Sequence, residues 1–112
     1  MAVFKSVYVK AEGVLASKLD SPQICKDLLR RIVNSLDYTI LKESFVSFKP
    51  QGLTGVLLLG ESHISVHTWP EKNLAVLGMV TCKRFGIKEK SQLRSIIKET
   101  LGPKSLSVKT VD

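Results

Sequence analysis

Residues 53–69, LTGVLLLGESHISVHTW, contain the two patterns that decide the fold. Residues 53–59 form an apolar run, which is typical of a buried strand. The run breaks at Gly60, and apolar and polar residues then alternate, which is the period of a strand with one buried face. The stretch therefore predicts a long apolar strand that is broken at Gly60 and resumes as an alternating one.

The flanking sequence predicts further strands and two helices. β-Branched and aromatic residues in partial alternation favour strands, whereas apolar residues at spacings of three and four favour amphipathic helices. Ser21 is the expected N-cap of the first helix, Pro22 its first residue, and the GP pair at 102–103 the end of the second. The predicted strands cover residues 3–9, 38–48, 73–82 and 105–111, and the predicted helices cover residues 21–36 and 89–101.

This order of elements predicts an α+β fold. We expect a two-layer α/β sandwich with an antiparallel or mixed sheet and two helices on one face. The chain has 112 residues, of which 44% are hydrophobic and 24% charged, so a single domain over residues 1–112 is expected. Its sequence has no run of about 18 apolar residues and no signal-peptide pattern at its start, which predicts a cytoplasmic protein without a membrane span.

The formal net charge of +7 raises the possibility of an anionic partner. The densest basic segment, residues 83–94, includes Glu89 and one aromatic residue, and it matches no groove-reading or base-stacking motif. A solvated basic surface is therefore favoured over nucleic-acid binding. Cys25 and Cys82 lack the spacing of a zinc site or a disulfide framework, and Cys25 beside an apolar helix stripe is expected to be a packing residue.

Residues 60–71, GESHISVHTWPE, carry an unusual amount of reactive chemistry. If residues 62–68 are extended, His63, Ser65 and His67 project to one face of the sheet. Such a face must meet something polar.

Three interpretations follow from these residues alone. A metal site is one, although only Glu61 or Glu71 stands nearby as a third ligand. A hydrolase using Ser62 or Ser65 with a histidine base is another, although no GxSxG turn is present. The third is a structural polar face with satisfied histidines.

The exact string favours a more specific hypothesis. LLGESHISVHTWPE (58–71) resembles the self-processing segment of the small prokaryotic S-adenosylmethionine decarboxylases, in which an apolar strand is followed by ESH and then HTWPE. SFKPQGLTGVLLL (47–59) is similar to that family's approach to the site, and AVLGMVTC (75–82) ends in a cysteine at the family's distance. The resemblance covers residues 45–82.

The resemblance implies that the chain cuts itself between Glu61 and Ser62. The fragments would comprise residues 1–61 and 62–112, and Ser62 would become a covalent pyruvoyl group. In the family this group forms a Schiff base with the substrate amine and accepts electrons as the carboxylate leaves. No metal and no external cofactor is implied.

The resemblance also assigns roles to individual residues. His67 would move a proton during processing, and Thr54 would support that step. Cys82 would reprotonate the substrate carbon. Phe48 and Glu71 would bind substrate, as an aromatic face for an adenine ring and a carboxylate for polar groups.

Strict alternation along a strand nevertheless places Ser62 and His67 on opposite faces. Gly60 is expected to allow an unusual backbone conformation beside the cleaved bond, because glycine has no Cβ.

The implied function is decarboxylation of S-adenosylmethionine for spermidine (polyamine) biosynthesis, carried out by a homodimer of processed protomers. Two positions depart from the family pattern: Gly78 stands where an Asp is usual, and Lys83 where a Gly is usual. These departures leave open which substrate the chain decarboxylates. The alternatives are a related pyruvoyl-dependent arginine or ornithine decarboxylase, and an inactive homologue that acts as a basic binding module.

Overall fold

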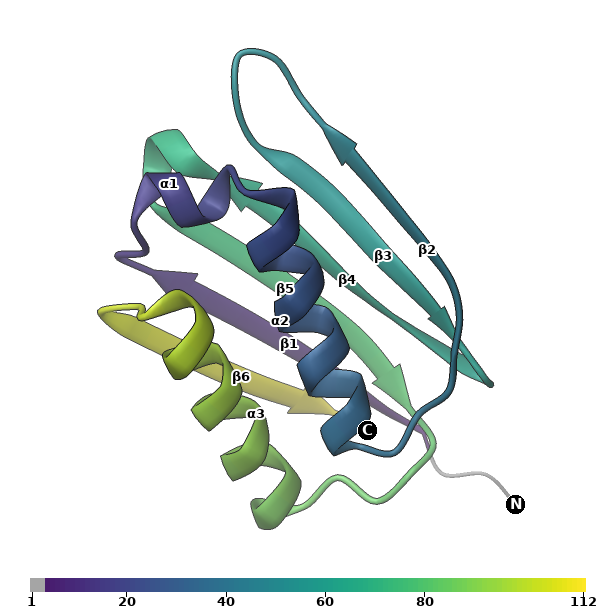
Figure 1. Cartoon of the computed structure of the whole chain (residues 1–112). Coiled ribbons are helices and arrows are strands. Elements are labelled where there is room, and N and C mark those ends of the chain that lie inside the picture. The colour runs from purple at the N-terminus through teal and green to yellow at the C-terminus, as the bar shows by residue number, and fades with distance from the viewer. Residues whose placement is uncertain (1–3) are drawn as a thin grey trace.

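The computed structural model describes residues 4–112. Their strands form one sheet in the order β2-β3-β4-β5-β1-β6, and every neighbouring pair is antiparallel (Figure 1). The elements in chain order are β1 (Lys5–Glu12), α1 (Ala16–Leu19), α2 (Pro22–Ser35), β2 (Ile40–Ser47), β3 (Leu53–Leu59), β4 (Ser62–Trp69), the 3-10 helix η1 (Pro70–Lys72), β5 (Leu74–Thr81), α3 (Ile87–Leu101) and β6 (Ser105–Val111).

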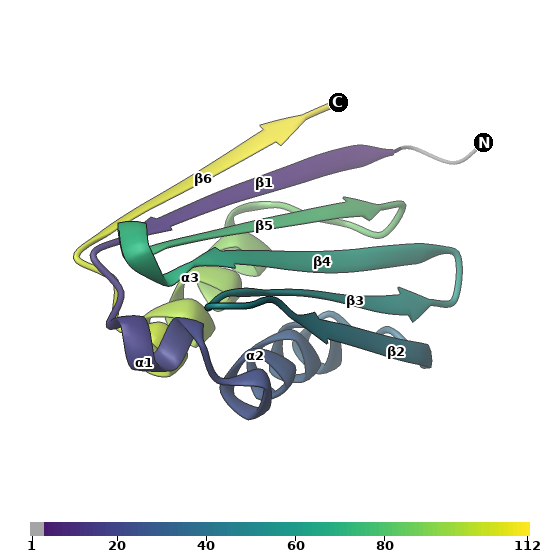
Figure 2. The same cartoon turned by 90° about the horizontal axis from the view of Figure 1, so that it is seen from above.

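The three α-helices of the described chain pack on the same face of this sheet (Figure 2). The predicted two-layer α+β sandwich is therefore confirmed, and its sheet is wholly antiparallel. α1 is an addition to the two predicted helices, because four residues are too few to show a helical period. The first strand begins at Lys5 and continues to Glu12, beyond the predicted end at Val9, while Val3 lies outside the described residues.

α2 begins as its sequence predicts. The Ser21 hydroxyl accepts a hydrogen bond from the Ile24 amide at 3.2 Å, and Pro22 is the first helical residue. The apolar stripe faces the sheet and is buried; it comprises Cys25, Leu28, Leu29, Ile32 and Val33.

α3 begins at Ile87, two residues before the predicted start at Glu89. The reason is a cap formed by Glu89 itself, whose carboxylate accepts the Gly86 amide hydrogen at 2.7 Å. This hydrogen bond also lowers the pKa of Glu89. The helix ends at Leu101, and Gly102 follows with a left-handed φ of 60°, as the GP pair indicates.

Two polar contacts hold the layers together. Thr68 is 5% exposed; its hydroxyl donates to the Leu19 carbonyl at 2.7 Å and accepts from the Leu53 amide at 3.0 Å. Arg30 of α2 donates two hydrogen bonds of 2.6 Å to Glu43 of β2, and they lower the pKa of that carboxyl. These contacts fix the helix layer to the half of the sheet that is formed by β2, β3 and β4.

The other face of the sheet carries no helix in the described part of the chain. We call it the open face; its side chains include Tyr8, Val46, Leu58, His67 and Trp69. Of these, Tyr8, Val46, Leu58 and Trp69 are exposed by 52%, 54%, 46% and 38%. These side chains are spread over four strands of the open face, and several large apolar side chains exposed on one face are typical of a surface that meets another molecule.

Within residues 4–112, no helix has both the length and the apolar character needed to cross a membrane.

Candidate active site

β3 and β4 form a hairpin in which Leu59 pairs with Ser62, so that Gly60 and Glu61 alone make the turn. Glu61 has a φ of 71°, a left-handed conformation that is unfavourable for a residue with a Cβ. Gly60 has no positive φ, and a Cβ added there would meet nothing within 4 Å. The unusual backbone conformation expected beside the cleaved bond is therefore present, and Glu61, the neighbour of Gly60, adopts it.

Ser62 and Cys82 lie beside this turn. The Ser62 hydroxyl donates to the carbonyl of Val80 on β5, and the Cys82 thiol lies 3.4 Å from a carboxylate oxygen of Glu61. The hairpin turn and the end of β5 thus bring together the predicted cleavage residues and the predicted proton donor. We call Glu61, Ser62 and Cys82 the Ser62 cluster.

The backbone beside Cys82 is held by Tyr38 and Thr81, which the sequence did not single out, and by Lys83. The hydroxyls of Tyr38 and Thr81 are 2.6 Å apart and buried, and the Thr81 hydroxyl accepts the Lys83 amide hydrogen at 3.1 Å. The Lys83 ammonium group donates to the carbonyl of Asp37 and lies 4.5 Å from the Tyr38 ring centroid. Lys83, one of the two departures, therefore has a structural role in this chain.

His67 and Thr54 form a second group. They are paired residues on β4 and β3, and the Thr54 hydroxyl lies 2.9 Å from His67 Nδ1. A cavity of about 300 Å³ adjoins them and is also lined by Phe48, Trp69 and Glu71. We call Phe48, Thr54, His67 and Glu71 the His67 cluster, with Trp69 beside it at 6.2 Å between the His67 and Trp69 ring centroids.

The two clusters lie at opposite ends of β4. Ser62 is its first residue and His67 follows five positions later, which places them roughly 17 Å apart at the rise of an extended strand. The predicted opposition of faces is also present, because Ser62 shares its side with buried Ile64 and Val66 while His67 lies on the open face. In one chain, His67 therefore cannot reach the Ser62 hydroxyl.

His63, Ser65 and His67 share the open face, as the alternation predicts. Among residues 4–112, no group of three or more His, Cys, Asp or Glu side chains is arranged to hold a metal ion. Gly78 of β5 lies opposite Ser65, and an added Cβ would stand 3.5 Å from the Ser65 hydroxyl oxygen, an ordinary contact. The backbone at position 78 therefore has room for a Cβ.

Cys25 lies in the core, as predicted, and is fully buried. Burial raises the pKa of its thiol to about 11, which disfavours the reactive thiolate. Cys82 is therefore the cysteine that is placed for chemistry.

Comparisons with known proteins agree with the site motif. The family model described as S-adenosylmethionine decarboxylase matches residues 5–112. The S-adenosylmethionine decarboxylase proenzyme of Sulfurihydrogenibium sp. (strain YO3AOP1) is 41% identical over 101 residues, which are 89% of this chain and 74% of that protein. The proenzyme of Aquifex aeolicus (strain VF5) is 44% identical over 70 residues, which are 62% of this chain; the match spans about half, 52%, of that relative's length.

Two solved structures share the fold. The crystal structure of the adenosylmethionine decarboxylase from Aquifex aeolicus VF5 superimposes with a TM-score of 0.82 at 30% identity, covering 98% of this chain and 89% of that one. The Trypanosoma brucei AdoMetDC-delta26 monomer gives a TM-score of 0.65 at 14% identity, covering 93% of this chain and 44% of that one, which shows a similar fold alone. With the motif, the fold and the family model in agreement, this chain belongs to the S-adenosylmethionine decarboxylase family.

Proposed function

We propose that this chain cleaves itself between Glu61 and Ser62 and then decarboxylates S-adenosylmethionine, the reaction that provides aminopropyl groups for spermidine synthesis. The observation that carries the proposal is the left-handed Glu61 in a two-residue hairpin turn, directly before a serine and beside the Cys82 thiol. Its relatives in Aquifex aeolicus and Sulfurihydrogenibium sp. are named proenzymes, which supports it.

The bonds that change in self-cleavage all belong to Glu61 and Ser62, and water is the one added reactant. The Ser62 hydroxyl attacks the Glu61 carbonyl, and the peptide nitrogen leaves with the hydroxyl proton, which converts the amide into an ester. Loss of the Ser62 α-proton then eliminates the Glu61 carboxylate and leaves a dehydroalanine. Its enamine tautomerises, and water releases ammonia, so that residues 1–61 end in a carboxylate and residue 62 becomes a pyruvoyl group. Strain in the left-handed Glu61 favours the bond rearrangement.

The proton transfer in this scheme needs a base, and His67 of the same chain is too distant. We infer that a second copy provides it. If two copies pack their open faces together about a two-fold axis that runs across β4, the N-terminal end of β4 in one copy lies over the C-terminal end of β4 in its partner. The hairpin turn that carries Ser62 then lies near the His67 cluster of the second copy, and because the Ser62 side chain lies on the helix side of the strand, the turn must rearrange for its hydroxyl to meet that histidine.

The open face suits this pairing. The midpoint between Ser62 and His67 falls near Ser65, whose neighbour across the ladder is Gly78. These small residues allow two sheets to approach closely at the proposed axis, while the exposed Tyr8, Leu58 and Trp69 provide apolar area to bury. The homodimer would thus form two composite sites.

The substrate is held by the His67 cluster. Phe48 is half exposed at the mouth of the cavity and offers its ring to an adenine face, while the Glu71 carboxylate can accept hydrogen bonds from hydroxyl or amino groups. Cys82 comes from the Ser62 cluster and returns a proton to the substrate carbon. A pyruvoyl group at residue 62 would supply a carbonyl that joins the substrate amine with loss of water and can then accept the electron pair left when carbon dioxide departs.

Arginine or ornithine decarboxylation is less well supported. Each of these substrates ends in a guanidinium or ammonium group that donates hydrogen bonds and needs acidic partners in the pocket, whereas the sulfonium of S-adenosylmethionine, although cationic, donates none. The loop after Cys82 instead carries Lys83 and Arg84, and Gly78 replaces a carboxylate. The basic loop is a poor partner for a cationic side chain.

The test has two parts. Denaturing mass spectrometry of the purified chain should find two fragments, and Ser62→Ala should leave one species of 12.4 kDa. Release of carbon dioxide should then be measured from carboxyl-labelled S-adenosylmethionine, arginine and ornithine. Release from S-adenosylmethionine supports the proposal, whereas release from arginine or ornithine alone, or an uncleaved wild-type chain, contradicts it.

A further inference from the structure

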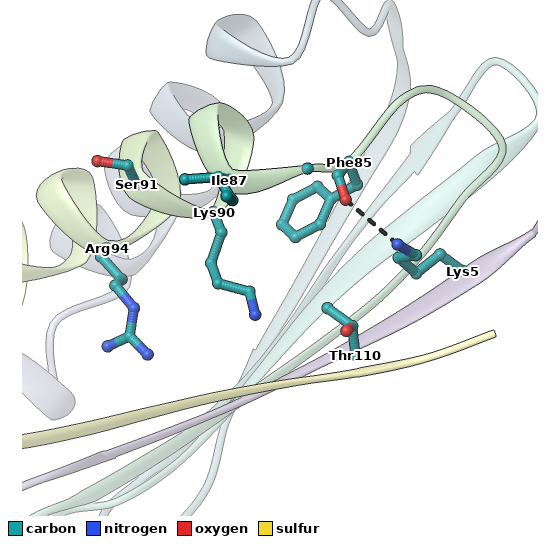
Figure 3. Close-up of a pocket in the computed structure, with 8 residues that line it drawn as sticks. Lys5, Phe85, Ile87, Lys90, Ser91, Arg94 and Thr110 are labelled. Carbon is teal, nitrogen blue, oxygen red and sulfur yellow. Dashed lines mark hydrogen bonds between the residues drawn. The ribbon is translucent and has the colours of Figure 1, made fainter.

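A second concave site lies on the helix side of the sheet, away from the open face. It is a cleft of about 390 Å³ between the first turns of α3 and the strands β1 and β6. Figure 3 shows Lys90 and Arg94 extending from α3 toward the strands, with Lys5 and Thr110 on the opposite wall. Three cationic side chains on two facing walls thus border one cleft.

The charges in this cleft are poorly compensated. Within the described residues, neither Lys90 nor Arg94 forms an ion pair; the Arg94 guanidinium donates one hydrogen bond of 3.3 Å to the Leu106 carbonyl. The Lys5 ammonium group donates to the Phe85 carbonyl at 3.4 Å (Figure 3) and lies 3.6 Å from the exposed carboxylate of Asp112. No acidic residue is among those that line the cleft.

The attraction for an anion comes from these side chains and not from the end of the helix. The Gly86 amide at the start of α3 already donates to the Glu89 carboxylate at 2.7 Å. The Lys90 and Arg94 heads stand one helical turn apart, and Lys5 faces them from the sheet. Cations spread along a cleft in this way favour an anion with more than one phosphoryl group over a single phosphate.

The residues that line the cleft also distinguish it from a surface that binds nucleic acid. Phe85 is the aromatic residue of the cleft, and it is 6% exposed, so its ring cannot act as a stacking platform for a base. We propose that the cleft formed by Lys5, Lys90 and Arg94 binds a small oligophosphate anion, such as inorganic diphosphate or the diphosphate part of a larger molecule. The neighbouring cavity shares Lys5, Phe85 and Gly86 with this cleft and reaches Cys82, so the bound anion lies close to the loop of the proposed active site.

The test measures anion binding and does not use enzymatic activity. A chain that fails to bind diphosphate can therefore be distinguished from a chain that fails to decarboxylate its substrate. The full purified chain is titrated calorimetrically with metal-free inorganic diphosphate and, separately, with monophosphate at low ionic strength. We expect diphosphate to bind more tightly than monophosphate and to raise the thermal unfolding midpoint, because a ligand that binds the folded state stabilises it.

Three variants make the test specific. Lys90→Gln with Arg94→Gln should weaken diphosphate binding about tenfold or more. The control, Lys72→Gln with Lys98→Gln, removes the same charge from exposed residues outside the cleft and should bind nearly as tightly as the wild type. Asp112→Asn removes the carboxylate that competes for Lys5 and should tighten binding, a gain that misfolding cannot imitate.

Equal loss of binding in the control and the cleft variant would overturn the proposal, because it would indicate diffuse attraction by net charge. A second contrary outcome is retention of single-stranded RNA by a chain that does not bind diphosphate, which would assign this surface to nucleic acid.

Discussion

The left-handed backbone of Glu61 predicts how substitutions at this residue change the rate of self-cleavage. Its φ of 71° costs a residue with a Cβ about 1 to 2 kcal/mol. The attack of Ser62 breaks the peptide bond that follows Glu61, so we expect the strain to be released as the bond rearranges. Glu61→Gly removes the strain from the uncleaved chain and should slow cleavage by up to roughly 5- to 30-fold, the rate equivalent of that energy.

Two matched variants separate backbone strain from the loss of the carboxylate. Glu61→Gln keeps the Cβ and the strain and should cleave faster than Glu61→Gly. Glu61→Asn should fall between them, because Asn adopts the left-handed conformation more readily than most residues. The assay is a time course of fragment formation after pulse-labelled cell-free synthesis, read on a denaturing gel. Cleavage of Glu61→Gly at or above the rate of Glu61→Gln would refute the role of strain.

Three further predictions concern stability and turnover. Gly55→Ala would place a Cβ 2.0 Å from the Phe45 ring and should lower the free energy of unfolding by about 1 to 3 kcal/mol in urea titrations, with an unchanged midpoint as the contrary result. The capping hydrogen bond of Glu89 lowers its pKa below the ordinary 4.5, so its stabilisation is present above that pH and is lost as the pH falls through the lowered pKa; the thermal midpoints of the wild type and Glu89→Gln should converge in acid, and a constant difference would contradict this. Cys82→Ser should still be cleaved but release carbon dioxide roughly 100-fold more slowly or worse, and full activity would exclude Cys82 as the proton donor.

The strands and helices were largely predictable because their periods are local. The alternation over β4 and the apolar stripe of α2 each follow from burial of one face, and Ser21 with Pro22 marks a helix start. α3 began earlier than expected because its cap is the carboxylate of Glu89, which reaches back to Gly86. A cap of this kind precedes the apolar repeat and is not part of it.

The site was predictable as a set of residues but not as an arrangement. The resemblance over residues 45–82 identified its members, and alternation indicated that Ser62 and His67 lie on opposite faces. What no local pattern shows is that the hairpin turn lies against the end of β5, where Ser62 contacts Val80 and Glu61 contacts Cys82.

The supports of Cys82 were missed for a related reason. Tyr38 and Thr81 are 43 positions apart, and their hydroxyls meet only after the sheet and α2 pack together. Neither residue belongs to a motif. An isolated buried hydroxyl has no sequence signal of its own.

The central claim is that each active site combines Ser62 of one copy with His67 of another, and mixed variants test it directly. Neither His67→Ala nor Ser62→Ala should be cleaved alone. When the two chains are refolded together, random two-fold pairing should place about half of the His67→Ala chains opposite an intact His67, and those chains should yield fragments 1–61 and 62–112. His63→Ala, a control on the same face, should be cleaved alone. Cleavage of His67→Ala without a partner, or a mixture that stays uncleaved although mixed dimers form, would contradict a shared site.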